Sequence, residues 1–148
     1  MEIQQDFKEL LALFNAHKVE YIIVGAYALA FHGAPRFTGD IDILVRPLPE
    51  NAKKILSVLE DFGFGSVNLT VDDFQKSDYI VQLGHPPVRV DIVASITGVR
   101  WEDAERGKQS GLYGTVPVFF LGKEQYIANK RATGRLKDKA DLEALGEK

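Results

Sequence analysis

The sequence predicts a single α+β domain in which helices pack on a small β-sheet and a helical tail follows at the C-terminus. Short apolar runs, each bounded by glycine, proline or charged residues, alternate along the chain with segments of helical periodicity. The 148 residues match one ordinary domain, and the 45% of hydrophobic residues suffices for a core without disulfides. We therefore expect one domain over 1–148, with a core over about 1–121 and a helical segment over about 122–148.

The first 45 residues predict a helix, a strand, a second helix and a second strand. Apolar residues at i, i+3, i+4 and i+7 indicate an amphipathic helix, and these residues are Phe7, Leu10, Leu11 and Phe14. The β-branched and aromatic run at 21–24 is typical of a buried strand, which Gly25 ends. A helix over 26–31 and a loop over 36–39 then lead to a strand that begins at Asp40.

Helical and strand patterns continue through the rest of the chain. Residues 55–62 have helical period up to Gly63, and Pro86 and Pro87 mark a turn before an apolar strand at 88–93. We interpret 94–114 as mixed helix and loop. The remaining predicted elements are strands at 79–83 and 116–121 and helices at 124–132 and 136–145.

The composition excludes several classes of function. The absence of cysteine excludes thiol catalysis, a zinc-thiolate site and a disulfide framework. A formal net charge of -3 argues against a surface dedicated entirely to nucleic acid, although it is compatible with a local basic patch. The first residues include acidic side chains and no long apolar run, so we expect neither a signal peptide nor a membrane span. The expectation is a cytoplasmic protein with no membrane partner.

Two aspartates carry the strongest chemical signal in the sequence. Asp40 and Asp42 are two residues apart in a predicted strand, so their carboxylates lie on one face of it. Placing two like charges within a few ångströms is costly unless a cation neutralises them, and a shared divalent metal is a physical reason for the pair. Asp91 lies in the middle of another apolar run, so it is either paired in the interior or faces a site.

Each of these features also has a purely structural interpretation. An Asp-x-Asp strand alone often marks a solvated edge or an ion pair, and Asp91 could pair with Arg89 or Arg36. Gly25 could be an ordinary turn glycine, and the histidines lack the spacing of metal ligands. Basic residues in the tail more often form a solvated face than a binding site. These residues are Lys123, Lys130, Arg131, Arg135, Lys137 and Lys139.

A three-part pattern connects these residues. Gly25-Ala26 is followed after thirteen residues by Asp40-Ile41-Asp42, and a later strand supplies Asp91. This pattern resembles that of the DNA polymerase β-like nucleotidyltransferase superfamily. More narrowly, VGAYALAFHGAPRFTGDIDILV and IANKRATGRLKDKADLEAL resemble AbiEii-type and minimal nucleotidyltransferases, which are found as partners in bacterial toxin–antitoxin systems. The resemblance spans about Tyr21 to Leu145 and implies the nucleotidyltransferase fold, with a small mixed β-sheet.

The resemblance also implies an activity and a set of site residues. It implies a Mg²⁺-dependent enzyme, with Mn²⁺ as an alternative metal, that transfers an NMP from an NTP such as ATP to a hydroxyl of a protein or RNA. Asp40, Asp42 and Asp91 are then both catalytic residues and metal ligands. The expected nucleotide-binding residues are Gly25, Ala26, Arg36, Thr38, Lys130 and Arg135. Asp138 and Asp141 are expected to orient the basic residues of the tail or to cap the last helix.

One residue departs from the superfamily pattern. Where the superfamily usually has glycine or serine after the first glycine, this chain has Ala26, so a serine hydroxyl contact to phosphate is absent while backbone N–H donation remains. The departure motivates an alternative, in which the protein is a catalytically weak or inactive binding module that acts on a toxin or antitoxin partner protein by contact alone. A third hypothesis is RNA binding through the basic tail.

Overall fold

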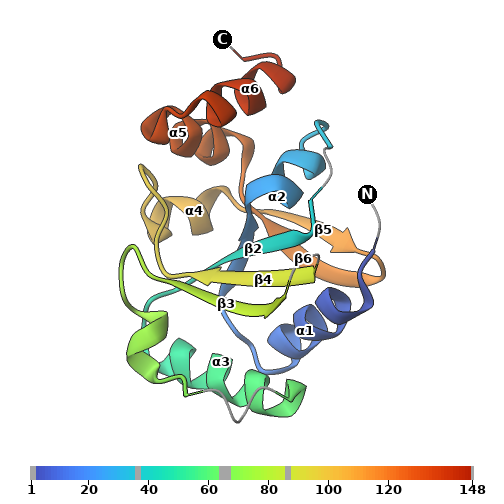
Figure 1. The fold of residues 1–148 in the computed structure, drawn as a ribbon, viewed down its shortest axis with the longest axis vertical. Coiled ribbons are helices and arrows are strands. Elements are labelled where there is room, and N and C mark those ends of the chain that lie inside the picture. The colour runs from blue at the N-terminus through green and yellow to red at the C-terminus, as the bar shows by residue number, and fades with distance from the viewer. Residues whose placement is uncertain (1–2, 36–37, 64–67, 86–87, 148) are drawn as a thin grey trace.

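The computed structural model describes residues 3–35, 38–63, 68–85 and 88–147, which form the helices and strands shown in Figure 1. The strands are β1 (Tyr21–Val24), β2 (Asp40–Val45), β3 (Ile80–His85), β4 (Val88–Val93), β5 (Gln109–Tyr113) and β6 (Val116–Phe120). The helices are α1 (Gln5–Ala16), α2 (Gly25–Phe31), α3 (Pro49–Phe62), α4 (Trp101–Gly107), α5 (Lys123–Thr133) and α6 (Leu136–Ala144), with a short 3-10 helix η1 (Val71–Phe74).

The strands form one mixed sheet in the order β3-β4-β2-β1-β6-β5. β2 is parallel to β4 and β1 is parallel to β6, whereas β1–β2, β3–β4 and β5–β6 are antiparallel. The mixed sheet with helices packed on it confirms the predicted α+β fold class. The central position of β2, between β4 and β1, places Asp42 opposite Val24 of β1 and Asp91 of β4. It also places Asp40 opposite Arg89 of β4.

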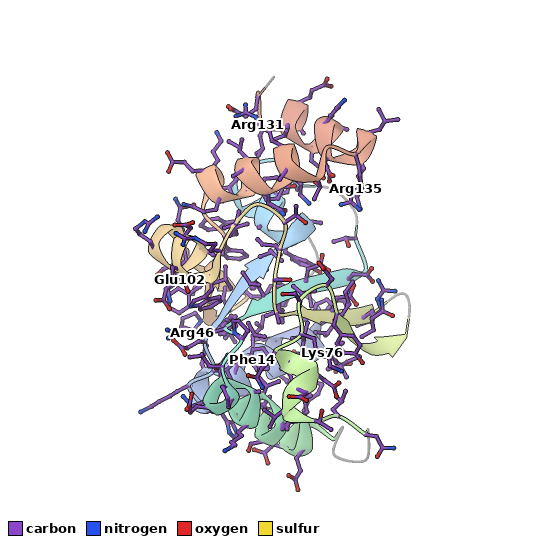
Figure 2. All side chains as sticks on the ribbon, turned by 90° about the vertical axis from the view of Figure 1, so that its left-hand side faces the viewer. Phe14, Arg46, Lys76, Glu102, Arg131 and Arg135 are labelled. Atoms are coloured by element: carbon purple, nitrogen blue, oxygen red, sulfur yellow. The ribbon has the colours of Figure 1, made fainter. Side chains whose placement is uncertain are left out.

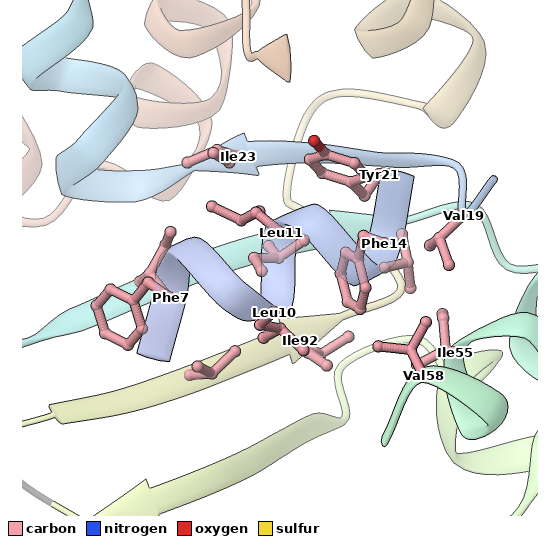
Figure 3. Packing of buried hydrophobic residues seen from close by; sticks show 14 of the residues in the cluster. Phe7, Leu10, Leu11, Phe14, Val19, Tyr21, Ile23, Ile55, Val58 and Ile92 are labelled. Atoms are coloured by element: carbon pink, nitrogen blue, oxygen red, sulfur yellow. The ribbon is translucent and has the colours of Figure 1, made fainter. Parts of the chain in front are cut away.

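Two hydrophobic clusters lie on the two faces of the sheet. One face packs against α1 and α3, and Figure 3 shows the apolar side of α1 directed at the strands. Phe7 and Leu11 have no exposed surface, which agrees with the spacing that predicted this helix. The other face packs against α2, α4 and α5, where Trp101 and Tyr126 are the largest buried side chains. Figure 1 shows α5 and α6 together at one end of the molecule.

One sequence-based interpretation is wrong in part. Residues 94–114 were expected to be mixed helix and loop, and α4 fits that expectation, but Gln109–Tyr113 is an edge strand. Gln109, Ser110 and Gly111 have little intrinsic preference for strands, so antiparallel pairing with β6 fixes this segment rather than its own composition. In the described part of the chain no helix is long and apolar enough to cross a bilayer.

Candidate active site

The predicted carboxylates meet where β2 and β4 run side by side. In the parallel register Asp42 is opposite Asp91, and Asp40 is opposite Arg89. The side chains of alternate residues point to the same face, so all three aspartates and Arg89 share one face of the sheet. Asp91 is buried with 7% of its surface exposed, whereas Asp40 and Asp42 are half-buried. Strand pairing therefore brings together two motifs that are 49 residues apart in the chain.

Arg89 joins two of the three carboxylates. Its Nε donates to Asp91 Oδ1 at 2.9 Å, and its Nη2 donates to Asp91 Oδ2 at 3.0 Å and to Asp40 Oδ2 at 2.9 Å. Such a fork between a guanidinium and a carboxylate is among the stronger ionic contacts in proteins. Both sequence-based alternatives for Asp91 thus hold at once, because it is ion-paired with Arg89 and also faces the site.

Gly25 brings the start of α2 against Asp42. Its backbone adopts φ +69°, a left-handed conformation that favours glycine. A Cβ added at Gly25 would overlap Asp42 Oδ2, so the position also requires the absence of a side chain. Gly25 is therefore more than a turn glycine, since it permits a close approach between the β1–α2 turn and the carboxylate.

Asp42 carries the least compensated charge of the three aspartates. Burial, followed by the charges of Asp91 and Asp40, raises the pKa of Asp42 to about 6. Lys130 and Lys137 act in the opposite direction but do not outweigh these effects. Among the described residues no hydrogen bond or ion pair reaches the Asp42 carboxylate, in contrast to Asp40 and Asp91. Asp42 is therefore the one of the three carboxylates that could pair with a further cation without giving up an ion pair to a described residue.

The corner between α5 and α6 supplies basic side chains above the carboxylates. Asp138 is fully buried and accepts hydrogen bonds from Arg135 Nε at 2.8 Å and from Thr133 Oγ1 at 2.5 Å. Burial alone would raise the pKa of Asp138, but the hydrogen bonds from Arg135 and Thr133 outweigh it and hold this pKa well below its usual range. Lys130 Nζ lies 3.6 Å from Asp138 Oδ1. Asp138 thus orients the basic residues, as predicted.

Lys130 and Arg135 differ in their surroundings. The side chain of Lys130 is only 12% exposed, and burial lowers its pKa. The side chain of Arg135 is 64% exposed, and Figure 2 shows it at the end of the helix pair formed by α5 and α6. Asp141, also buried, accepts a hydrogen bond from the Tyr126 hydroxyl at 3.4 Å. Buried acids of α6 therefore bind side chains of α5 and of the turn between the two helices, and so join the two sides of the corner.

A single cavity unites these groups. It has a volume of about 790 Å³, which lies within the range of small-molecule sites in proteins. Its lining includes the carboxylates and Arg89 from β2 and β4, which we call the carboxylate wall, and basic side chains of the α5–α6 corner, which we call the basic wall. Ser95, Ile96 and Thr97 also line it. The sequence-predicted residues that line it are Gly25, Ala26, Thr38, Asp40, Asp42, Asp91, Lys130 and Arg135.

The predicted set is changed in three details. Arg36 lies outside the described residues. Thr38 lines the cavity, but its hydroxyl is engaged with the backbone of Asp40, from whose N–H it accepts a hydrogen bond at 3.1 Å. Lys137 and Asn129 also line the cavity and were not predicted. The only available signal for Lys137 was its place in the basic run, which could not distinguish the residues that face the site from those that face solvent.

The donor set fits a hard divalent cation in its chemistry. Three carboxylates on adjacent strands offer oxygen ligands, which Mg²⁺ and Mn²⁺ prefer, and burial together with the charges of Asp91 and Asp40 raises the pKa of Asp42. As arranged here, however, the described His, Asp and Glu side chains include no group of three spaced to hold one metal ion. In this arrangement the guanidinium of Arg89 donates hydrogen bonds to both Asp40 and Asp91.

Comparison with solved structures identifies the fold. The chain is similar to a nucleotidyltransferase candidate from Thermotoga maritima, with 18% identity, a TM-score of 0.65, and coverage of 93% of this chain and 88% of that one. It is also similar to the lincosamide antibiotic adenylyltransferase LnuA in its lincomycin-bound form, with 17% identity, a TM-score of 0.63, and coverage of 99% and 98%. The antibiotic-resistance factor ANT(2″)-Ia matches with 15% identity, a TM-score of 0.58, and coverage of 95% and 80%.

No family model and no curated protein matches the sequence. The structural likeness nevertheless covers nearly the whole chain in each of the three cases. The chain therefore has the nucleotidyltransferase fold.

Proposed function

We propose that the protein is a metal-dependent nucleotidyltransferase of the DNA polymerase β-like superfamily that moves an NMP from an NTP to an acceptor hydroxyl. The observation that carries the proposal is the pairing of Asp42 with Asp91 across β2 and β4, inside a cavity that also has the basic wall. Acidic and basic groups that line one cavity suit a substrate that is a polyanion and needs a cation. A nucleoside triphosphate with its metal is such a substrate.

The basic wall binds and orients the triphosphate. Lys130 is the best placed, because it is mostly buried, lines the cavity and is held by Asp138 at 3.6 Å. Arg135 and Lys137 add charge at the exposed rim. Gly25 and Ala26 allow the backbone to approach phosphate closely, so the missing serine hydroxyl removes one contact and leaves the others. Arg36 remains a predicted phosphate contact.

The carboxylate wall holds the metal and receives the proton. Asp40, Asp42 and Asp91 would hold Mg²⁺ or Mn²⁺, which when bound neutralises phosphate charge and aligns the attacking and leaving oxygens. The acceptor oxygen forms a bond to the α-phosphorus, the bond from that phosphorus to the bridging oxygen breaks, and pyrophosphate leaves. Asp91 takes the proton of the acceptor hydroxyl. The protein itself contributes to the reaction by holding the carboxylates of β2 and β4 and the basic side chains of the α5–α6 corner around one cavity.

Two lines of support suggest two kinds of acceptor. The sequence resemblance to AbiEii-type enzymes supports a hydroxyl of a protein or RNA, including a toxin–antitoxin partner protein. LnuA and ANT(2″)-Ia, whose structures were determined with lincomycin and with adenylyl-2″-tobramycin, support a small hydroxylated molecule and ATP as the donor. An assay with a protein extract, an RNA pool and a panel of such small molecules as separate acceptors distinguishes these sources.

The proposal is tested by transfer of label from an α-³²P-labelled NTP in the presence of Mg²⁺ or Mn²⁺. The wild-type protein should label an acceptor, and Asp42→Asn and Asp91→Asn should each lower the rate by about 10²-fold or more. Asp72→Asn, which changes an exposed aspartate of η1 far from the cavity, is the matched control and should retain the wild-type rate. Undiminished transfer by both site variants would refute the assignment.

The alternative of an inactive binding module makes the opposite prediction. Its support is Ala26, which lines the cavity in place of the superfamily's glycine or serine. A module that acts by contact alone should give no heat of binding with Mg²⁺ and any of the four NTPs in calorimetry. RNA binding through the basic tail should instead weaken steeply as the salt concentration rises.

A further inference from the structure

Arg89 occupies the space between two predicted metal ligands. Its guanidinium makes three hydrogen bonds of 2.9 to 3.0 Å, two to the oxygens of Asp91 and one to Asp40 Oδ2. The side chain is 26% exposed, and its backbone N–H donates to Gly39 O, which fixes the strand next to the loop before Asp40. Arg89 is therefore a built part of the site rather than a surface side chain that happens to lie nearby.

The charges around Arg89 explain its position. Asp40, Asp42 and Asp91 bring three formal negative charges to one face of two paired strands. A buried carboxylate without a cationic partner is costly, so the folded protein without metal needs a compensating charge. Arg89 provides one positive charge to Asp40 and Asp91, and Asp42 remains without an ion pair from the described residues.

A cation that uses the same carboxylates competes with Arg89. Both oxygens of Asp91 and one oxygen of Asp40 point at the guanidinium, so these oxygens are turned toward Arg89 and away from a shared ligand position. A guanidinium and a divalent ion within a few ångströms also repel each other. Shared ligation by Asp40 and Asp91 therefore requires the guanidinium to move.

We propose that Arg89 is the resident counter-cation of the carboxylate cluster, and that binding of a divalent cation displaces its guanidinium from Asp40. The inference rests on the proposed function only in taking these carboxylates as a cation site. Arg89 acts through the aspartates and is a positioning residue. Before the cation binds, its guanidinium compensates the charges of Asp40 and Asp91 in the folded protein.

The experiment compares Mn²⁺ binding by the wild-type protein, Arg89→Gln and Arg46→Gln, without nucleotide, by electron paramagnetic resonance of the free ion. Arg46→Gln is the matched control, because Arg46 forms an ion pair with Glu20 at 3.0 Å and has a similar exposure, 37%, at the far end of β2. Arg89→Gln should bind Mn²⁺ at least about fivefold more tightly than wild type, because a competing charge is removed. Arg46→Gln should bind as wild type does.

Thermal unfolding and NMR give independent readouts. Without metal, Arg89→Gln should melt at a lower temperature than wild type, and Mn²⁺ should raise its melting temperature by more than it raises that of wild type. If Arg89→Gln does not fold, two measurements remain. Arg89→Lys keeps the charge but loses the fork of hydrogen bonds to Asp40 and Asp91, so its side chain competes less well and Mn²⁺ should bind more tightly than in wild type. In addition, the Arg89 Nε–H resonance of wild type should shift when Mg²⁺ is added.

Equal or weaker Mn²⁺ binding by the Arg89 variants, or an Nε–H resonance that does not respond to saturating Mg²⁺, would overturn the counter-cation role. If the Arg89 experiments fail but the wild-type protein still transfers label from an α-labelled NTP, the proposed function stands without a counter-cation role for Arg89. If no form of the protein binds Mn²⁺ and wild type transfers no label, both the proposed function and this inference fail.

Discussion

At the scale of single residues, the site depends on positions where stability and function conflict. Gly25 adopts a left-handed conformation and allows Asp42 to approach the β1–α2 turn. Asp42 carries a charge that burial and two neighbouring carboxylates disfavour. A protein retains such strained or costly groups where a ligand later compensates them. Replacing Gly25 or Asp42 alone separates the cost of the left-handed backbone from the cost of the buried charge.

Replacing Gly25 by alanine should destabilise the protein by about 2–4 kcal/mol, because the left-handed backbone and the overlap with Asp42 act together. Gly114→Ala is a matched control, since Gly114 has nearly the same φ, +63°, but a Cβ there would meet no atom closer than 3.4 Å. It should cost only about 1–2 kcal/mol. Chemical denaturation of both variants measures the difference, and equal losses would contradict the close approach.

Replacing Asp42 by asparagine should raise the free energy of unfolding of the metal-free protein at pH 7.5 by about 1–3 kcal/mol. The folded protein holds the Asp42 proton more tightly than the unfolded chain does, because its pKa is raised to about 6. This group therefore makes the wild-type protein less stable as the pH rises from about 4 to about 6. That contribution should be absent in Asp42→Asn.

Denaturation curves recorded in EDTA over this pH range make the comparison, with Asp72→Asn as the control that keeps the wild-type profile. A lower stability of Asp42→Asn at pH 7.5, with an unchanged pH dependence, would show that Asp42 is already compensated in the folded protein.

At the scale of elements, the α5–α6 corner is a preformed wall that depends on one buried acid. Asp138 accepts a hydrogen bond from the Arg135 backbone N–H at 3.2 Å in addition to those from the side chains. It therefore caps the N-terminus of α6 and also holds the basic side chains. The C-terminal end of α5 is closed by Gly134, whose φ of +64° allows the sharp change of direction. The corner is therefore rigid where it faces the cavity.

Replacing Asp138 by asparagine should lower the free energy of unfolding by about 1–3 kcal/mol at pH 7, because Arg135, Thr133 and Lys130 lose a buried anionic partner. The pKa of Asp138 lies below its usual range, so its contribution is complete above about pH 4 and is lost as the pH falls further. Affinity for NTP should fall as well, because Lys130 is no longer oriented.

Calorimetric titration with an NTP and thermal unfolding measure these two effects. Glu143→Gln removes an exposed carboxylate from the same helix and should change neither. An Asp138→Asn variant with wild-type stability and wild-type NTP affinity would mean that the corner does not depend on this network.

At the scale of the whole molecule, the sequence predicts the helices and strands whose residues follow a regular local pattern, but not how distant strands pair. The alternation of Asp40 and Asp42 in a strand, and the helical spacing of Phe7 and Leu11, follow from the periods of strands and helices. The position of Asp91 beside Asp42 depends on the parallel pairing of β2 with β4, which no local pattern contains. The resemblance to a known superfamily supplied that step.

The remaining features could not be read from the sequence because they arise between distant elements. β5 exists through its pairing with β6, since Gln109, Ser110 and Gly111 at its start have little preference for strands. Lys137 belongs to a basic run in which only the turn between α5 and α6 decides which side chain faces the cavity. Arg89 was considered as a partner of Asp91, but its bond to Asp40 requires the register of two strands.

The central claim is that this cavity transfers a nucleotidyl group, and a paired label experiment tests it most directly. The wild-type protein, Mg²⁺ and an acceptor are incubated with the same NTP carrying either an α-³²P or a γ-³²P label. The account predicts that the α label becomes attached to the acceptor, that the γ label appears in pyrophosphate, and that Asp42→Asn lowers the rate of both by about 10²-fold or more. Attachment of the γ label to the acceptor, or α-label transfer that is undiminished in Asp42→Asn, would contradict it.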